Sequence, residues 1–380
     1  MGQLLSYEQP TPYIVESTDY NDKYKTPVLT AGKSFVLGYT DEDFGIYNSL
    51  PVIIFDDFTT ATQYVNFPFK VKSSAMKILI ANTELVLPKF IYYRMQIIEF
   101  DHSTHKRYWI QQYSKIKIEI PSIPEQERIV ARIEELCSQL DSGVETLKKI
   151  QRQLAVYRQA VLKEAFDGSL TGIKPREVKR LGEYIEPPRY GTSKKCTYTA
   201  TEEHTPVYRI PNVDHVAGRI NHDDIKYAAL TKQELEGITL EEGDILIIRS
   251  NGSISLVGKA AMVCAVDIKG SFAGYLMRLR IIDVEKLEPK FLLWFLQSHF
   301  ARIYIESKAK STSGVHNINS KEISGLQIPL FSQIEQVQII QAIESRLSVC
   351  DSIEQTVDTA LQQAEAMWQS ILKRAFEGRL

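Results

Sequence analysis

Apolar residues three or four positions apart recur over two long stretches of the chain, and this spacing predicts two long helices. Residues so spaced lie on one face of a helix, and a narrow apolar stripe of this kind is typical of a coiled-coil seam. The first seam is expected to contain Ile129, Ile133, Leu136, Leu140, Val144, Leu147, Leu154 and Val161. The second is expected to contain Ile339, Ile343, Leu347, Cys350, Ile353, Val357, Leu361, Ala364, Met367 and Ile371.

Both stretches carry the sequence features of helix ends. Each opens on Ser-x-x-Glu, at residues 122–125 and 332–335. This spacing predicts a capping box, in which the serine and glutamate side chains each accept the other residue's backbone N–H. Each stretch also reaches a glycine, Gly168 or Gly378, a residue that favours helix C-termini. A helix of about 45 residues is roughly 65 Å long at a rise of 1.5 Å per residue.

The two stretches are copies of each other. Adding 210 to a residue number in the first copy (332 − 122 = 210) gives its counterpart in the second. The pairs include Ser122 with Ser332, Glu125 with Glu335, Ile133 with Ile343, Asp141 with Asp351, Phe166 with Phe376 and Gly168 with Gly378. Solenoid repeats are about 20–50 residues long, so this much longer period indicates two large units that alternate with two long helices.

Short apolar runs bounded by turn residues precede each long helix and predict strand-rich globules. In the first globule, strands are expected at residues 28–29, 35–37, 52–55, 67–71 and 116–118, and a short helix at 88–96. The second globule repeats these features in the same order, at 205–208, 244–249, 289–297 and 328–329. The polar residues 171–180 predict a linker between the first long helix and this globule.

Two helices of matching length in one chain most simply pack on each other. Because each leaves an equivalent globule, we predict an α+β fold with two antiparallel coiled-coil helices, a pseudo-twofold arrangement and neighbouring chain termini. Such a molecule is circular in organisation. The expected segments are a globule at 1–120, a helical spacer at 121–170, a second globule at 171–328 and a second spacer at 329–380.

Charge and cysteine content narrow the function classes. A formal net charge of -2 and a pI of about 6.4 argue against coating nucleic acid by bulk charge but allow local basic patches. Four well-separated cysteines without a C-x-x-C pair indicate reduced thiols, with neither disulfides nor a zinc site. With no leader after Met1 and no run of about 18–20 apolar residues, we expect a soluble cytoplasmic protein.

Catalytic motifs are missing from the sequence. There is no phosphate-binding G-x-x-x-x-G-K-[ST], no G-x-G-x-x-G, no H-E-x-x-H and no metal-ligand spacing among the seven histidines. Residues 186–190 (Glu-Pro-Pro-Arg-Tyr) are the nearest candidate. Amino-methyltransferases need Asn or Asp before Pro-Pro and an aromatic residue directly after it, to hold and stack a flipped base. Glu186 and Arg189 stand there instead, so we interpret the segment as a rigid turn and predict no catalytic or metal-binding residue.

Four loops mix cationic, aromatic and amide side chains, the types that contact phosphates and base edges. The candidate DNA-binding residues are Thr59, Thr60, Lys106, Arg107 and Tyr108 in the first globule, and Arg189, Tyr190, Thr192, Ser193, Lys194, Lys195, Arg249, Asn251, His316 and Asn317 in the second. The alternative is that they are solvated loop residues, since Asn251 before Gly252 is also good turn chemistry. Asp56 and Asp57 repel phosphate and are expected to hold a turn or to orient a neighbouring group.

Several motifs give the chain a family resemblance along nearly its full length. They are the repeated Glu-Gln…Ile-Glu helix starts and Leu-Lys-x-Ala-Phe-x-Gly-x-Leu helix ends, together with Arg209-Ile-Pro-Asn-Val, Gly243-Asp-Ile-Leu-Ile-Ile-Arg-Ser-Asn-Gly, Phe272-Ala-Gly-Tyr-Leu-x-Arg-Leu-Arg and Ser313-Gly-Val-His-Asn-Ile-Asn. The chain resembles the specificity (S) subunit of Type I restriction–modification enzymes. The first globule matches less tightly, and its start is short.

The resemblance implies a non-catalytic, sequence-specific DNA-recognition subunit. Its two globules would be target recognition domains that each read one half of a split sequence with a fixed gap. The helices would separate them and dock two methyltransferase (modification) subunits, and restriction subunits would add cleavage. S-adenosylmethionine, ATP and Mg are then expected on the partners and no cofactor in this chain, with self-association when partners are absent.

Two other classes of function compete with this interpretation. A coiled-coil scaffold whose globules bind protein is favoured by the acidic net charge and the charged helix faces. Such a scaffold would tolerate substitution of Lys106, Arg107, Arg249 and Asn251 without any change in DNA selectivity. An enzyme in its own right is disfavoured by the missing motifs, and methylation of DNA by the purified chain would revive it.

Overall fold

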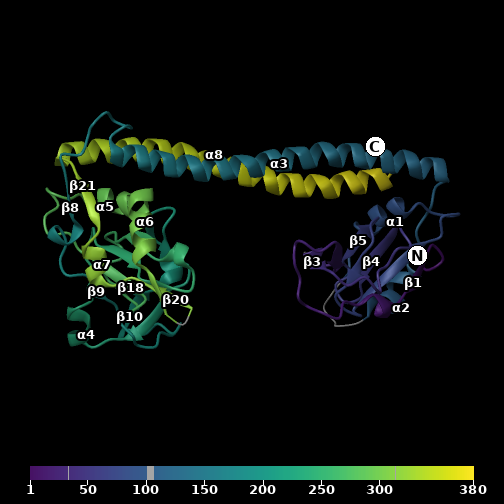
Figure 1. The fold of residues 1–380 in the computed structure, drawn as a ribbon, viewed down its shortest axis with the longest axis horizontal. Helices are drawn as coiled ribbons and strands as arrows, with labels where there is room; N and C mark the ends of the chain where they lie inside the picture. The colour runs from purple at the N-terminus through teal and green to yellow at the C-terminus, as the bar shows by residue number, and fades with distance from the viewer. Residues whose placement is uncertain (33, 101–106, 313) are drawn as a thin grey trace. The chain divides into compact units, whose positions relative to one another are not determined.

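Two long helices, α3 (Ile123–Asp167) and α8 (Gln333–Phe376), dominate the computed structural model (Figure 1). They contain 45 and 44 residues, as the apolar periodicity predicts. The structure describes residues 1–32, 34–100, 107–312 and 314–380.

The chain divides into two compact units, and each unit contains parts of both long helices. Unit 1 consists of Met1–Lys148 and Asp358–Leu380, and unit 2 of Lys149–Val357. Packing therefore groups each globule with its helix segments. The four sequence segments 1–120, 121–170, 171–328 and 329–380 stay a prediction.

Unit 1 contains two small sheets. A four-stranded antiparallel sheet has the order β1-β7-β4-β5, and a three-stranded sheet has the order β3-β2-β6, with β2 and β6 parallel. The strands are β1 (Leu5–Glu8), β2 (Thr26–Leu29), β3 (Val36–Thr40), β4 (Val52–Asp56), β5 (Thr62–Val65), β6 (Lys70–Val71) and β7 (Met76–Ala81). The short helices are α1 (Pro88–Met95) and α2 (Tyr108–Gln111), with 3-10 turns η1 (Thr11–Tyr13) and η2 (Tyr113–Lys115).

The central strand β4 separates two apolar clusters. Alternate residues of a strand point to opposite faces, so Ile53 and Phe55 pack in the cluster that contains α1, whereas Val52 and Ile54 pack in the other. All four are at most 1% exposed. The uninterrupted apolar run thus forms a strand buried on both faces.

Unit 2 is larger and has four sheets. Their orders are β11-β12-β16-β14-β18-β9, β13-β10-β17, β15-β20-β19 and β21-β8. The strands are β8 (Glu177–Arg180), β9 (Arg189–Tyr190), β10 (His204–Tyr208), β11 (Val213–Asp214), β12 (Arg219–Ile220), β13 (Lys226–Ala229), β14 (Ile245–Ile248), β15 (Ser250–Asn251), β16 (Ala260–Met262), β17 (Ser271–Phe272), β18 (Leu276–Leu279), β19 (Lys310–Thr312), β20 (Val315–Asn317) and β21 (Gln327–Leu330). The helices are α4 (Lys232–Glu236), α5 (Pro289–Gln297), α6 (His299–Lys308) and α7 (Ser320–Ser324), with 3-10 turns η3 (Leu181–Glu183), η4 (Ile210–Asn212) and η5 (Ile254–Leu256).

In both units a buried glutamine joins a long helix to a short one. Gln126 accepts the Leu87 N–H (2.8 Å) at the start of α1 and donates to the Leu85 and Pro121 carbonyls. Its counterpart Gln336 accepts the Glu288 N–H (2.9 Å) at the start of α5 and likewise donates to two backbone carbonyls. Both side chains belong to residues that are 0% exposed. The duplication therefore extends to individual hydrogen bonds.

Within each unit, the start of one long helix packs against the end of the other. In unit 1, Ile133 of α3 and Leu372 of α8 share a cluster, and Phe376 lies 5.2 Å from the Phe90 ring of α1. In unit 2, Phe166 of α3 lies 5.2 Å from the Phe291 ring of α5. The antiparallel coiled coil over the whole length of both helices stays a prediction. Both chain termini belong to unit 1.

Two sequence predictions about local structure are wrong. Residues 116–118 form no strand, because no described strand of unit 1 pairs with them. The equivalent β21 is paired with β8, which lies inside the segment expected to be a linker. The expected rigid turn at 186–190 is extended, and its last two residues form β9 on the edge of the six-stranded sheet.

The helix starts and the seam also differ from prediction in places. Ser332 and Glu335 form the expected capping box, but Glu125 binds Arg128 instead (2.7 Å). In the seam, Ile353 and Met367 are 40% and 55% exposed. The buried face passes one residue further along the chain, where Glu354 binds Arg158 and Trp368 packs in the unit 1 helix cluster.

Candidate nucleic-acid interface

The ends of β4 and β14 are equivalent positions in the two units. Both strands place an isoleucine opposite a leucine of the neighbouring strand, Ile53 opposite Leu79 and Ile245 opposite Leu279. Counting four residues onward (53 + 4 = 57; 245 + 4 = 249) leads to Asp57 and Arg249. At the same strand end, unit 1 has an acid and unit 2 a base.

In unit 1, Asp57 belongs to the scaffold. It is 3% exposed, lies 3.4 Å from the Lys77 ammonium and accepts the Trp109 N–H (2.8 Å). Its neighbour Asp56 accepts the backbone N–H groups of Phe58 and Thr59. Asp56 therefore holds the turn, as expected, whereas the Asp57 side chain ties α2 and β7 to the strand end.

The candidate residues of unit 1 lie on two segments that meet at Asp57, whose backbone carbonyl accepts the Tyr108 N–H (2.9 Å). Thr59 is exposed on the turn after β4, and Thr60 lies beside it with a positive φ of 57°. Arg107 is exposed at the start of α2. Tyr108 is 1% exposed within the core, so the prediction that it contacts DNA is wrong. Its ring lies on the buried side of α2, which the neighbouring cationic residues did not indicate. Lys106 lies outside the described residues.

In unit 2, the structure brings the predicted loops together around one pocket of about 700 Å³. Of the candidates, Thr192, Ser193, Lys194, Arg249 and Asn317 line it. It is also lined by Cys196, Arg209, Ile210, Pro211, Lys226, Ser250, Ala273, Gly274 and Tyr275. Four of the lining residues are cationic and none is acidic.

Arg249 is fixed in place beside this pocket. Its guanidinium carbon lies 4.3 Å from the centre of the Tyr190 ring, and Nη1 donates to the Gly274 carbonyl (3.0 Å). Its Nε is buried without a hydrogen-bond partner. The ring is held in turn, because the Tyr190 hydroxyl accepts the Ser320 N–H (3.0 Å). Stacking on an aromatic ring restricts a guanidinium to one plane.

Two other cations of the pocket already have acidic partners. Lys194 binds Glu234 (2.8 Å), and this hydrogen bond lowers the pKa of that carboxyl to about 2. Arg209 binds Asp224 (2.6 Å), which lowers the pKa of Asp224 below its usual range. Their charges are therefore largely balanced within the unit.

Lys226 is a pocket residue that the sequence did not reveal. It extends over the Tyr198 ring at 4.4 Å, and no ion pair of it appears among the described residues. It lies on β13, whose sequence Lys-Tyr-Ala-Ala contains no second cationic residue that would mark it as a candidate for DNA binding. The partner Tyr198 is 68% exposed, and an aromatic ring exposed beside a lone lysine is the feature that marks the place.

The candidates Arg189, Lys195, Asn251 and His316 are not among the residues that line the pocket. Asn251 and His316 pair across β15 and β20, and the Asn251 side chain accepts the Ser253 N–H (2.8 Å). Asn317 on β20 donates to the Val315 carbonyl. Arg189 on β9 is exposed, as are Ser193 and Lys195.

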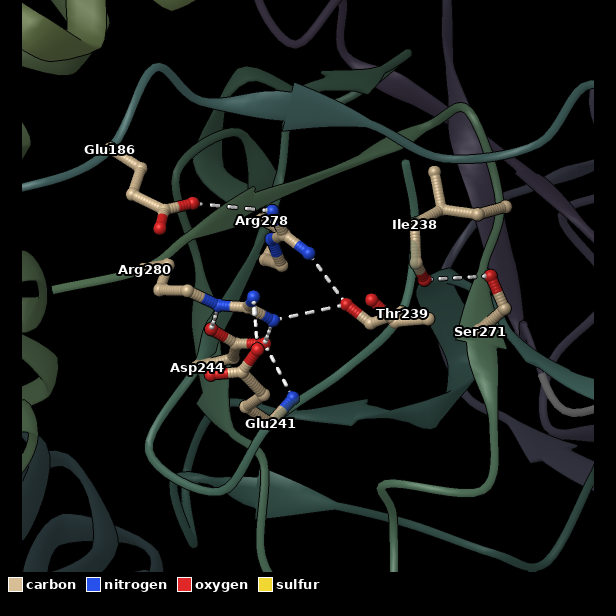
Figure 2. A network of polar contacts seen from close by, with 8 residues as sticks. All are labelled: Glu186, Ile238, Thr239, Glu241, Asp244, Ser271, Arg278 and Arg280. Carbon is tan, nitrogen blue, oxygen red and sulfur yellow. Dashed lines mark hydrogen bonds and ion pairs between the residues drawn. The ribbon is translucent and has the colours of Figure 1, made fainter. Parts of the chain in front are cut away.

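Arg278 on β18 and Arg280 directly after it belong to a polar network with acidic residues and the Thr239 carbonyl (Figure 2). Arg278, 5% exposed, donates to the Thr239 carbonyl (2.5 Å) and lies 3.6 Å from Glu186. Arg280 binds Asp244 (2.7 Å) and also donates to Thr239 (3.1 Å). Burial lowers the pKa of Arg278, whereas the Asp244 hydrogen bond raises that of Arg280. The network ties the segment before β9 to β18 and so fixes the strand that carries Tyr190.

Neither a metal cluster nor a membrane-spanning element is evident in the residues that the structure covers. No group of three or more His, Cys, Asp or Glu side chains there could hold a metal ion. No helix among them is long and apolar enough to cross a membrane.

The sequence of this chain is similar to those of several known proteins. Over 382 residues the chain is 29% identical to the Type I restriction enzyme EcoR124I/EcoR124II specificity subunit of Escherichia coli, covering 97% of this chain and 91% of that protein. It is 32% identical over 276 residues to the StySPI specificity subunit of Salmonella potsdam, covering 70% of this chain and 58% of that protein. No family model matches the chain.

A solved structure has the same fold. It comes from work on complex assembly and conformational transition of the type I R-M system, and it matches 99% of this chain and 98% of its own with a TM-score of 0.70 and 18% identity. The fold class is a duplicated chain of mixed helices and strands that contains two long helices. By sequence, the chain is similar to the specificity subunits of Type I restriction enzymes over most of its length.

Proposed function

We propose that this chain is the DNA-recognition subunit of a Type I restriction–modification complex and that each unit reads one half of a bipartite sequence. The observation that carries the proposal is a duplicated scaffold whose equivalent strand ends differ, with Asp57 buried in unit 1 and Arg249 lining a pocket in unit 2. Gln126 and Gln336 make the same bonds in both units, whereas the equivalent strand ends carry Asp57 and Arg249. A shared frame with unlike strand ends suits two different half-sites.

The long helices serve as the spacer between the half-sites in this proposal. With α3 and α8 antiparallel over their whole length, the molecule would have pseudo-twofold symmetry and a circular organisation. The gap in the recognised sequence would then follow from the number of helical residues.

The proposal assigns catalysis to partner subunits. Two methyltransferase subunits would dock on this chain and carry S-adenosylmethionine, and restriction subunits with ATP and Mg would add cleavage in the cytoplasm. The near-neutral net charge of -2 suits a subunit that supplies discrimination while its partners share the phosphate contacts.

Changing the length of the helices tests the spacer. One heptad inserted into each of α3 and α8 adds about 10 Å at 1.5 Å per residue, or about 3 base pairs at 3.4 Å each. We expect adenine methylation, mapped in cells that carry the chain and its methyltransferase, to retain both half-sites and to lengthen the gap by about 3 base pairs.

The matched control replaces seven exposed residues in the same helices and keeps their length, and it should leave the gap unchanged. A longer helix with an altered half-site and the original gap would contradict the proposal.

A further inference from the structure

We infer that Arg249, held on the Tyr190 ring, selects a guanine in the half-site read by unit 2, whereas Lys226 contacts a phosphate. This inference rests on the proposed function and adds a base to it. Both residues line the same pocket, but their surroundings suit them to different acceptors.

The guanidinium of Arg249 has only one edge left for a ligand. Its Nε is buried, and one Nη1 hydrogen is bound to the Gly274 carbonyl at 3.0 Å. Nη2 has no hydrogen-bond partner among the described residues, and with the remaining Nη1 hydrogen we assign it to an end-on fork of two donors. Two parallel donors fit the O6 and N7 acceptors of guanine in the major groove, whereas adenine offers a donor at one of these positions.

The orientation of that fork is set before any ligand arrives. Tyr190 lies 4.3 Å from the guanidinium, and its hydroxyl accepts the Ser320 N–H from α7. A preformed fork loses little side-chain entropy on binding. Neighbouring Thr192 and Asn317 supply polar groups at the same rim.

Lys226 has the opposite properties. Its ammonium is a point charge on a flexible stem, extended over the exposed Tyr198 ring at 4.4 Å. It has no fork geometry with which to distinguish bases, so a phosphate oxygen is its natural acceptor.

The test uses the full complex of the chain with its methyltransferase and a DNA library randomised across both half-sites. Arg249→Gln should reduce the preference for guanine at one position of one half-site by about 10- to 100-fold. Arg249→Lys keeps the charge but not the planar fork and should weaken the same preference by less than Arg249→Gln does. Tyr190→Leu should weaken it by about 2- to 5-fold, because the fork loses its platform. The other half-site should be unaffected in all three.

Lys226→Met should instead weaken binding to every sequence alike and reduce the salt dependence by about 0.9 in the log–log slope. Lys286→Met, at a lysine whose side chain is 70% exposed and paired with Asp283, is the matched control and should change neither quantity. Thermal melting of each variant shows that the unit is still folded.

The outcomes distinguish failure of the proposed function from failure of the guanine assignment. A wild-type complex without sequence preference overturns the proposed function. A selective wild type whose preference survives Arg249→Gln at every position overturns only the guanine assignment. Uniform weakening by Arg249→Gln also overturns it, since Arg249 then binds a phosphate.

Discussion

Asp57 and Arg249 follow equivalent strands, yet one is buried in its unit and the other faces a pocket. The adjoining strand explains the difference. Lys77 of β7 lies at 3.4 Å from Asp57, whereas the register of β18 places Met277, an apolar core residue, at the corresponding position. Burial of a carboxylate is costly unless the charge is paired and hydrogen-bonded, so the neighbouring Lys77 allows this strand end to be part of the scaffold in unit 1.

The comparison shows that the two units share a frame but not a site. Strand register, short helix and glutamine bridge are duplicated, while the side chains beyond the strand ends are not. A residue at the same place in the frame therefore has no fixed role, and the units are expected to respond differently to substitution there and alike to substitution in the frame.

The largest effect should come from removing the buried acid. Asp57→Ala leaves Lys77 buried without a counter-charge and the Trp109 N–H without an acceptor, and we expect unit 1 to lose about 3–5 kcal/mol of stability. Arg249→Ala breaks one hydrogen bond at the pocket and should cost unit 2 about 1 kcal/mol. Amide hydrogen exchange, measured separately on β4 and β14, reports each unit.

Asp57→Asn is the matched control, because it keeps an acceptor for Trp109 and removes only the charge. It should fall between wild type and Asp57→Ala. Equal costs for Asp57→Ala and Arg249→Ala would contradict the distinction between scaffold and surface.

A smaller and equal effect is expected where the units are alike. Gln126→Ala and Gln336→Ala each leave one backbone N–H and two carbonyls without their partner, and unsatisfied buried groups of this kind cost about 1–3 kcal/mol each before water reaches them. We expect about 3 kcal/mol in both units. Hydrogen exchange at the starts of α1 and α5 checks this.

Gln139→Ala, at an exposed position of α3, is the control and should stay within about 0.5 kcal/mol of wild type. A clear loss of stability in one unit and none in the other would show that the glutamine hydrogen bonds do not contribute equally to the two units.

Much of the frame could be predicted because its causes are local. The period of apolar residues predicts α3 and α8, and a proline followed by an apolar run predicts α1 and α5. Equivalent positions in the two copies predict Phe166 and Phe376 as counterparts, and each packs on the short helix of its own unit.

The site could be predicted only in part because its causes are distant in sequence. The sequence indicates that Lys194 and Arg249 are cations, but not that Glu234, 40 residues from Lys194, already binds one of them. Tyr108 is next to a cationic run and yet is buried, since the packing of α2 decides its environment. Tertiary contacts decide which cations remain available to a ligand, and residue type alone does not reveal those contacts.

The smallest effect concerns the two helix starts, where the copies diverge. Hydrogen bonds with the Ser332 side chain and backbone, followed by Arg176, lower the pKa of Glu335 to about 2. The pKa of Glu125 is also lowered, but by Arg128, with no bond to Ser122. A carboxyl whose pKa falls on folding stabilises the folded state above its ordinary value of 4.5, and this contribution is lost as the pH falls towards 2.

Glu335→Gln removes the charge and keeps a side chain that suits a capping box. It should lower the Tm slightly at pH 7, and the difference from wild type should shrink as the pH falls from about 4.5 towards 2, because the glutamate is protonated in the unfolded chain below 4.5 but stays charged in the folded state until about pH 2. Glu125→Gln should have a smaller effect, because Arg128 on the same exposed helix face is its main partner and such pairs contribute little. Tm measured from pH 7 down to pH 3 distinguishes the two. A difference that is independent of pH, or larger for Glu125, would mean that the charge on Glu335 does not stabilise the start of α8.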